Sequence, residues 1–184
     1  TSFLVILAIM ALMVVVDYRR LLHIEAEADL INRDAVPGIY YSTSVRAAWF
    51  GGFVLVQDAY VQEDEGERRA GLAGLPASDK ALEELYTAYE KTVMRDDDRQ
   101  LFEAFKKALA DYMRIRAAVL TPQMLGNPQQ AREYIRTQLR PAFYVGRDIL
   151  AQMVAENKKQ ADQATQGIQD AVDNAEFGML TSLG

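Results

Sequence analysis

The sequence predicts an all-α fold, an antiparallel up-down-up-down four-helix bundle whose long first and fourth helices run to a membrane. Strand signals are nearly absent, whereas long segments repeat apolar residues with helical periodicity. Turn signals divide the 184 residues into two long helical segments at the chain ends and two shorter ones between them. Short turns make consecutive helices antiparallel, which gives the bundle topology.

The first helix is expected to run from the N-terminal apolar segment to about residue 65. A kink or break is expected at Pro37, because proline lacks a backbone N–H and clashes with the preceding turn. Residues 66–77 contain three glycines and a proline and are predicted to form a loop. Ser78 is the expected N-cap of a second helix that continues through residues 81–94.

The third helix is expected over residues 98–120, capped by one of the three consecutive aspartates near its start. Residues 120–128 read as the next turn, in which Asn127 is the expected N-cap and the proline after it is the first helical residue. The fourth helix then continues to about residue 174. It is expected to kink at Pro141.

An apolar run without charges occupies residues 3–16. It is shorter than the roughly 20 residues of a full membrane crossing, so a signal-peptide core and the end of a transmembrane helix are both considered. No small-residue cleavage motif follows, and we therefore expect the end of a transmembrane helix over 1–20, a four-helix domain over 21–176 and the start of a second transmembrane helix over 177–184. The two arginines directly after the run would by themselves favour a cytoplasmic side.

Composition argues against an enzyme. There is no cysteine, and His23 is the single histidine, so neither a cysteine nucleophile nor a histidine ligand set can form. The sequence has no Glu-x-x-His pair for a di-iron bundle and no Gly-rich phosphate loop after a strand. The acidic clusters at 63–67 and 95–99 lack the spacing of a calcium loop. We expect no cofactor and no metal, and the net charge of −6 disfavours nucleic acid as a partner.

Five landmarks follow one another along the chain. A proline followed by apolar residues precedes an arginine, an acidic turn leads into a leucine-containing helix with a central tyrosine, and a Gly-Asn turn opens a last helix that ends in a polar, Asn-containing stretch. In the same order, these five landmarks are residues 36–39, Arg46, residues 94–113 with Tyr112, residues 126–128 and residues 155–166. In this order and spacing the whole chain resembles the four-helix-bundle sensor domain of methyl-accepting chemotaxis proteins.

The resemblance implies a periplasmic ligand sensor in the inner membrane. It also implies a homodimer that passes a small displacement of its fourth helix to a cytoplasmic signalling coiled coil. Aspartate-sensing members of the family carry an R-x4-R-x3-R series on the first helix. Arg46 matches the first arginine, but Gly51 and Leu55 occupy the other two positions. The incomplete clamp disfavours aspartate or serine as the ligand and a site at the dimer interface.

Arginines and tyrosines gather at one level when the predicted helices are laid side by side. If core residues recur at alternating spacings of three and four, Arg46 lies on the core side of the first helix and Arg116 on the core side of the third. The rise of about 1.5 Å per residue brings further arginines and tyrosines to nearby heights, and Gly51 and Gly52 leave room beside them. The sequence thus predicts a site for a small organic acid or amino-acid-like anion, formed by Arg46, Tyr86, Tyr112, Arg116, Arg136 and Arg140.

Other interpretations of the same residues stay open. The arginines can pair with acids on a neighbouring helix, the series at 132, 136 and 140 can be a solvated face, the tyrosines can be core residues, and the glycines can allow close packing between subunits. The acids considered are Glu83, Glu84, Glu103 and Asp111. For the whole chain, the alternatives are the input domain of a sensor histidine kinase and a non-sensing, membrane-anchored dimerisation stalk.

Overall fold

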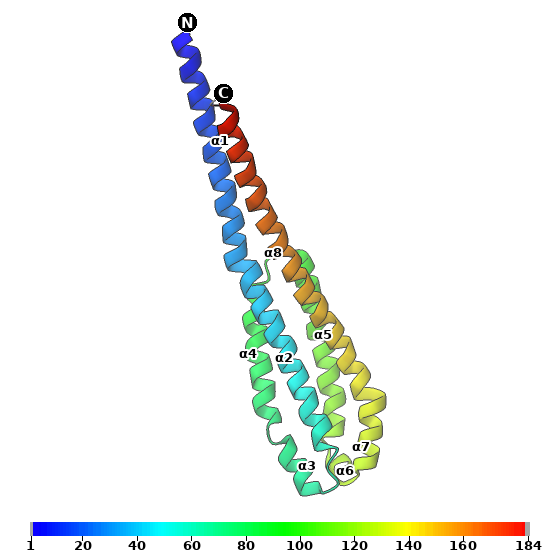
Figure 1. Cartoon of the computed structure of the whole chain (residues 1–184). Helices are drawn as coiled ribbons and strands as arrows, with labels where there is room; N and C mark the ends of the chain where they lie inside the picture. Colours follow the sequence, from blue (N-terminus) through cyan, green and yellow to red (C-terminus); the bar gives the residue numbers. More distant parts are fainter. Residues whose placement is uncertain (1, 183–184) are drawn as a thin grey trace. The chain divides into compact units, whose positions relative to one another are not determined.

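The computed structural model describes the backbone of residues 2–182 and their side chains except at 2, 6, 9 and 175–182. Within this range the regular elements are all helical, as predicted (Figure 1). They are α1 (Ser2–Leu30), η1 (Ile31–Ala35), α2 (Val36–Ala59), α3 (Glu65–Leu72), α4 (Leu75–Glu90), α5 (Asp96–Val119), α6 (Pro122–Gly126), α7 (Pro128–Tyr134), η2 (Ile135–Leu139) and α8 (Arg140–Ser182), where η marks a π-helical segment.

The chain divides into two compact units. Unit 1 contains residues 1–36 and 158–184, and unit 2 contains residues 37–157. In unit 1, α1 and the C-terminal part of α8 run side by side (Figure 1), and Gly167 of α8 lies against the Glu27 side chain of α1.

Much of the apolar surface of α1 is exposed. Among the described residues, no helix combines the length and the apolar character that a membrane crossing needs. The second membrane segment expected over 177–184 lies outside the residues whose side chains are described. The expected boundaries at residues 20 and 176 stay predictions.

Unit 2 is the four-helix bundle that the sequence predicts, formed by α2, α4, α5 and the N-terminal part of α8 with the short helices at its tip. Its core is built around Trp49 of α2, which is 1 % exposed. The rings of Phe105, Tyr112 and Phe143 surround Trp49, with centroids 5.7, 4.5 and 5.8 Å away. The Trp49 indole N–H donates to the Phe143 carbonyl at 3.2 Å, which links α2 to α8.

Both prolines that were expected to kink or break a helix follow a π-helical segment. Pro37 comes two residues after η1, and Pro141 two residues after η2. The residue before each proline donates its N–H five residues back, Val36 to the Ile31 carbonyl and Arg140 to that of Ile135. A proline cannot make the normal i→i−4 bond, and the wider π turn lets each helical path continue through it.

The loop predicted over 66–77 is wrong, since most of this segment is helical. The Asp64 side chain caps α3 by accepting the Glu67 N–H at 2.9 Å. Gly71 is a packing residue, because a Cβ at this position would lie 3.2 Å from that of Ala59. The N-cap of α4 is Gly74, so Ser78 lies inside α4 and does not cap it. The glycines that suggested a loop serve close packing and a helix start.

The other caps are partly as predicted. Arg95, in an extended conformation, is the N-cap of α5, and the three aspartates occupy its first turn, so the expected aspartate cap is wrong. Asn127 caps α7 by accepting the Gln130 N–H at 3.1 Å, which confirms the prediction. The turn before it contains the short helix α6, capped by Thr121, which the sequence analysis missed.

Candidate functional site

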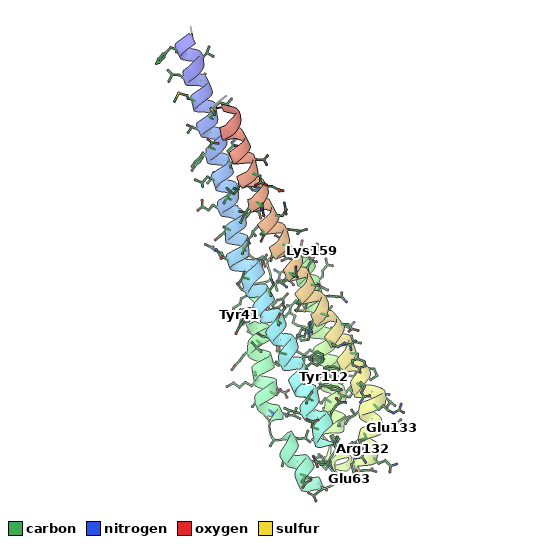
Figure 2. All side chains as sticks on the ribbon, in the orientation of Figure 1. Tyr41, Glu63, Tyr112, Arg132, Glu133 and Lys159 are labelled. Carbon is green, nitrogen blue, oxygen red and sulfur yellow. The ribbon has the colours of Figure 1, made fainter. Side chains whose placement is uncertain are left out.

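The structure does not gather the six predicted site residues into one site. Tyr112 and Arg116 of α5 are buried, and Figure 2 labels Tyr112 in unit 2. Arg46 and Arg136 are exposed, while Tyr86 and Arg140 are half-buried. The six residues divide into an interior cluster on α5, separate positions on α2 and α4, and a surface pair at the start of the last helix.

The placement of Arg46 on the core side of α2 is wrong. The inward face of α2 carries Ser42, Val45, Trp49 and Phe53, which are all buried. Val45 and Arg46 are neighbours on the helix, and either would satisfy a spacing of three or four residues from Ser42. The apolar valine takes the core position because an unpaired buried guanidinium is costly.

Arg116 is buried as predicted but already has a carboxylate partner. Its guanidinium binds both carboxylate oxygens of Asp79 on α4, at 2.8 and 2.5 Å. A Cβ on Gly52 would lie 4.0 Å from an Arg116 nitrogen and 3.3 Å from the Ser78 hydroxyl, so Gly52 makes room beside Arg116. Pairing with an acid was an open alternative, but Asp79 was not among the acids considered.

The Tyr112 hydroxyl is buried beside the Arg116 guanidinium without a well-formed hydrogen bond. Burial raises the pKa of Tyr112 to about 12, and the positive charge of Arg116 opposes this rise. The phenol is therefore neutral at physiological pH. Arg116, Asp79 and Tyr112 form a structural cluster in which the arginine is already neutralised.

Tyr86 belongs to a different surface. Burial raises its pKa, Glu83 and Glu90 raise it further, and Lys106 lowers it. Lys106 binds Glu90 at 3.3 Å and Glu103 at 2.6 Å. The charges of Glu83 and Glu90 beside Tyr86 do not suit the binding of an anion there.

A groove of about 240 Å³ joins the end of α2 to the start of the last long helix. Three arginines line it at intervals of four residues, one each from α7, η2 and α8. The lining residues are Gln57, Tyr60, Val61, Arg132, Ile135, Arg136 and Arg140. The π-helical segment η2 lies within the groove wall, and such segments are frequent at functional sites.

The three arginines of the groove differ in their partners. Arg132 binds the Glu63 carboxylate at 2.9 Å and the Tyr60 carbonyl at 3.2 Å, and Figure 2 places Arg132 beside Glu63 at the tip. Arg136 is paired with Glu133 at 2.6 Å, which raises the pKa of Arg136 and lowers that of Glu133. Among the described residues, Arg140 has no ion-pair partner. Arg140 therefore offers the groove an uncompensated positive charge.

Hydrogen bonds connect the floor of the groove to the tip of the bundle. The Tyr60 hydroxyl donates to the Val119 carbonyl of α5, and burial raises the pKa of Tyr60 while Arg68 lowers it. Arg68 is 2 % exposed and donates to the carbonyls of Leu125, Gln62 and Glu63 at 2.7–2.9 Å. The sequence pattern did not indicate a buried role for Arg68, because it lies in the segment that was predicted to be a loop.

The geometry defines an all-helical bundle with a small, arginine-lined groove near its tip. The profile of a family described as a four helix bundle sensory module for signal transduction matches residues 1–172. The chain belongs to this family, whose members are sensor modules of methyl-accepting chemotaxis receptors. A search among curated proteins finds no match to the chain.

Proposed function

We propose that this chain is the periplasmic sensor domain of a membrane-anchored chemoreceptor and that it binds a small organic anion in the arginine-lined groove. The observation that supports this most is the half-buried Arg140, which faces the groove without an acidic partner among the described residues. A guanidinium in this position can bind a carboxylate through two parallel hydrogen bonds. A sensor of this kind requires no catalysis.

The shape of the groove suggests an acid with a compact apolar body. Tyr60, Val61 and Ile135 supply apolar surface, while the arginines and Gln57 supply polar groups. A volume of about 240 Å³ lies below the 300–1,000 Å³ typical of drug-sized ligands. We therefore propose a single-ring or short-chain carboxylate, oriented by Arg140.

The groove also suggests how binding leads to a signal. Its walls come from the end of α2 and from α7, η2 and α8, so a bound anion bridges the first and last helices of the bundle. Binding shifts α8 only if the ligand prefers one arrangement of these helices over the other. In the proposed receptor, α8 passes this displacement across the inner membrane to a cytoplasmic signalling coiled coil.

An exposed stripe on α2 supports a homodimer. Its members recur at alternating intervals of three and four residues, the spacing of a helix–helix seam. They are Tyr40, Thr43, Ala47, Phe50 and Val54, all exposed. Charging this stripe with Val54→Glu is expected to convert the dimer to a monomer in sedimentation analysis, and an unchanged sedimentation coefficient would argue against this interface.

The binding proposal can be tested with the 184-residue chain and a thermal-shift screen of organic acids and amino acids. Any acid that stabilises the chain is then titrated by calorimetry. Arg140→Ala is expected to weaken its binding at least tenfold, the equivalent of about 1.4 kcal/mol. Arg114→Ala is the matched control, because Arg114 is exposed on α5 and paired with Asp111. Stabilisation by no acid, or equal affinity of the Arg140 variant and wild type, would refute the groove as the site.

Arg46→Ala tests whether the ligand binds in this groove or at the position of the arginine clamp of aspartate-sensing relatives. Arg46 is exposed on α2 and does not line the groove. Unchanged affinity in Arg46→Ala together with loss in Arg140→Ala assigns the ligand to the groove. The reverse pattern would place the ligand on the exposed face of α2.

A further inference from the structure

A buried polar cluster lies at the opposite end of α2 from the groove. Asn157 of α8 is fully buried, and its side-chain amide donates to the Tyr89 hydroxyl of α4 at 2.9 Å. The same amide nitrogen lies 3.4 Å from the Asp98 carboxylate of α5 and 2.9 Å from the Met153 carbonyl. The Tyr89 hydroxyl donates in turn to the Asp98 carboxylate. One amide of α8 is thus bound to both middle helices of unit 2.

The fourth helix of the bundle completes the cluster through Gly38. A Cβ on this residue of α2 would lie 1.8 Å from the Asn157 Oδ1 atom and 2.8 Å from Cγ. These distances are far shorter than any real carbon contact, so only glycine lets the amide lie against the α2 backbone. Oδ1 itself has no hydrogen bond to a described residue. Asn157 therefore fits at one height along α2.

We propose that Gly38 and Asn157 form a latch that fixes the register of α8 against α2, with Tyr89 and Asp98 holding the amide in place. The proposal rests on the proposed function, in which α8 is displaced along the bundle. A slide of one residue is about 1.5 Å, which lengthens and misaligns the 2.9 Å hydrogen bond between the Asn157 amide and the Tyr89 hydroxyl. It also moves the amide out of the gap that Gly38 leaves on α2.

The position of the latch in the chain suits this role. Gly38 is the second residue of unit 2 and Asn157 is its last, so the latch acts where both long helical paths leave the bundle. A ligand in the groove bridges the end of α2 and the start of α8. It displaces α8 only if its binding overcomes the hydrogen bonds of Asn157. The latch sets the resting register of the sensor.

Trp49 provides a register probe that needs no label. It is the only tryptophan, and its indole N–H spans from α2 to the Phe143 carbonyl of α8. Trp49 is 11 residues from Gly38, or about 16 Å along the helix axis. A local packing defect at Asn157 does not reach this hydrogen bond, whereas a change in the register of α8 does.

The experiment records the indole resonance of the ¹⁵N-labelled 184-residue chain by NMR without ligand. One resonance is expected for wild type, and a second or clearly shifted resonance for Asn157→Ala and for Gly38→Ala. The matched control is Ser42→Ala, since Ser42 is a fully buried polar residue of α2 whose hydroxyl donates to the Ile39 carbonyl of the same helix. A single resonance at the wild-type position in both latch variants would overturn the proposal.

A second measurement covers the case in which Gly38→Ala folds poorly. In the double variant Gly38→Ala/Asn157→Ala the clash is removed, because the Asn157 Cβ lies 3.7 Å from the added methyl group. The double variant is expected to have a higher urea midpoint than Gly38→Ala alone, and a lower one would overturn the contact. Since no ligand is used, a groove that binds no acid refutes the proposed function and leaves this result unaffected.

Discussion

Gly146 of α8 packs directly on the ring of Trp49, and Gly146→Ala probes how rigid this core is. A Cβ at position 146 would lie 2.5 Å from Cζ2, 2.9 Å from Cε2 and 3.1 Å from Cη2 of Trp49. Non-bonded carbon atoms attract best at about 3.5–4.0 Å, so the added methyl group overlaps the ring by about 1 Å. Either the ring or the helix backbone must move.

The magnitude follows from two opposing effects. Alanine is the better helix former and stabilises an exposed helical position by about 1 kcal/mol relative to glycine. Overpacking a tight core costs about 1–3 kcal/mol, sometimes more. The upper end applies here, because three aromatic rings surround Trp49 and its indole is bound to the Phe143 carbonyl. We expect a net destabilisation of about 2 kcal/mol.

The assay is urea unfolding followed by the fluorescence of Trp49, which reports on unit 2 alone because the chain has one tryptophan. Gly51→Ala is the matched control, since Gly51 lies on the exposed face of α2, where an added Cβ would enter open space. This control is expected to be more stable than wild type by up to about 1 kcal/mol. The reasoning is refuted if Gly146→Ala is as stable as wild type.

Three further variants test the buried polar groups by the same unfolding assay. Asp79→Ala should lower the free energy of unfolding by about 2 kcal/mol. This is less than the roughly 3–5 kcal/mol for breaking a fully buried pair, because the Asp79 side chain is 36 % exposed. Adding Arg116→Met to Asp79→Ala should recover most of this loss, and a loss near zero in Asp79→Ala would contradict the buried pair. Tyr112→Phe should change stability by less than about 0.5 kcal/mol at pH 7, because it removes a hydroxyl without a good hydrogen bond. Since the pKa of Tyr112 is raised to about 12 in the folded state, wild type should lose stability as the pH rises from about 10 through 12, and Tyr112→Phe should lack this part of the loss. Arg68→Met should cost about 3 kcal/mol, because three carbonyls lose a charged donor, and a loss below about 1 kcal/mol would show that water replaces the guanidinium.

Local sequence patterns determined the helices and their order. Apolar periodicity and the helix breakers predicted the four bundle helices, and Asn127 followed by proline predicted the start of α7. These features depend on neighbouring residues, so they can be read from the chain directly. The same reasoning failed at residues 66–77, where glycine is used for packing against Ala59. Composition alone does not distinguish a packing glycine from a turn glycine.

The tertiary structure decided which charges are free. The sequence placed Arg116 in the core, but its partner Asp79 lies 37 residues away and was not anticipated. Arg46 and Val45 satisfy the same helical spacing, and only the cost of burying an unpaired guanidinium turns the valine inward. The arginine-lined groove likewise forms only when the end of α2 meets η2 and α8. Helix formation depends on contacts within a few residues, whereas burial and ion pairing depend on which distant segments meet.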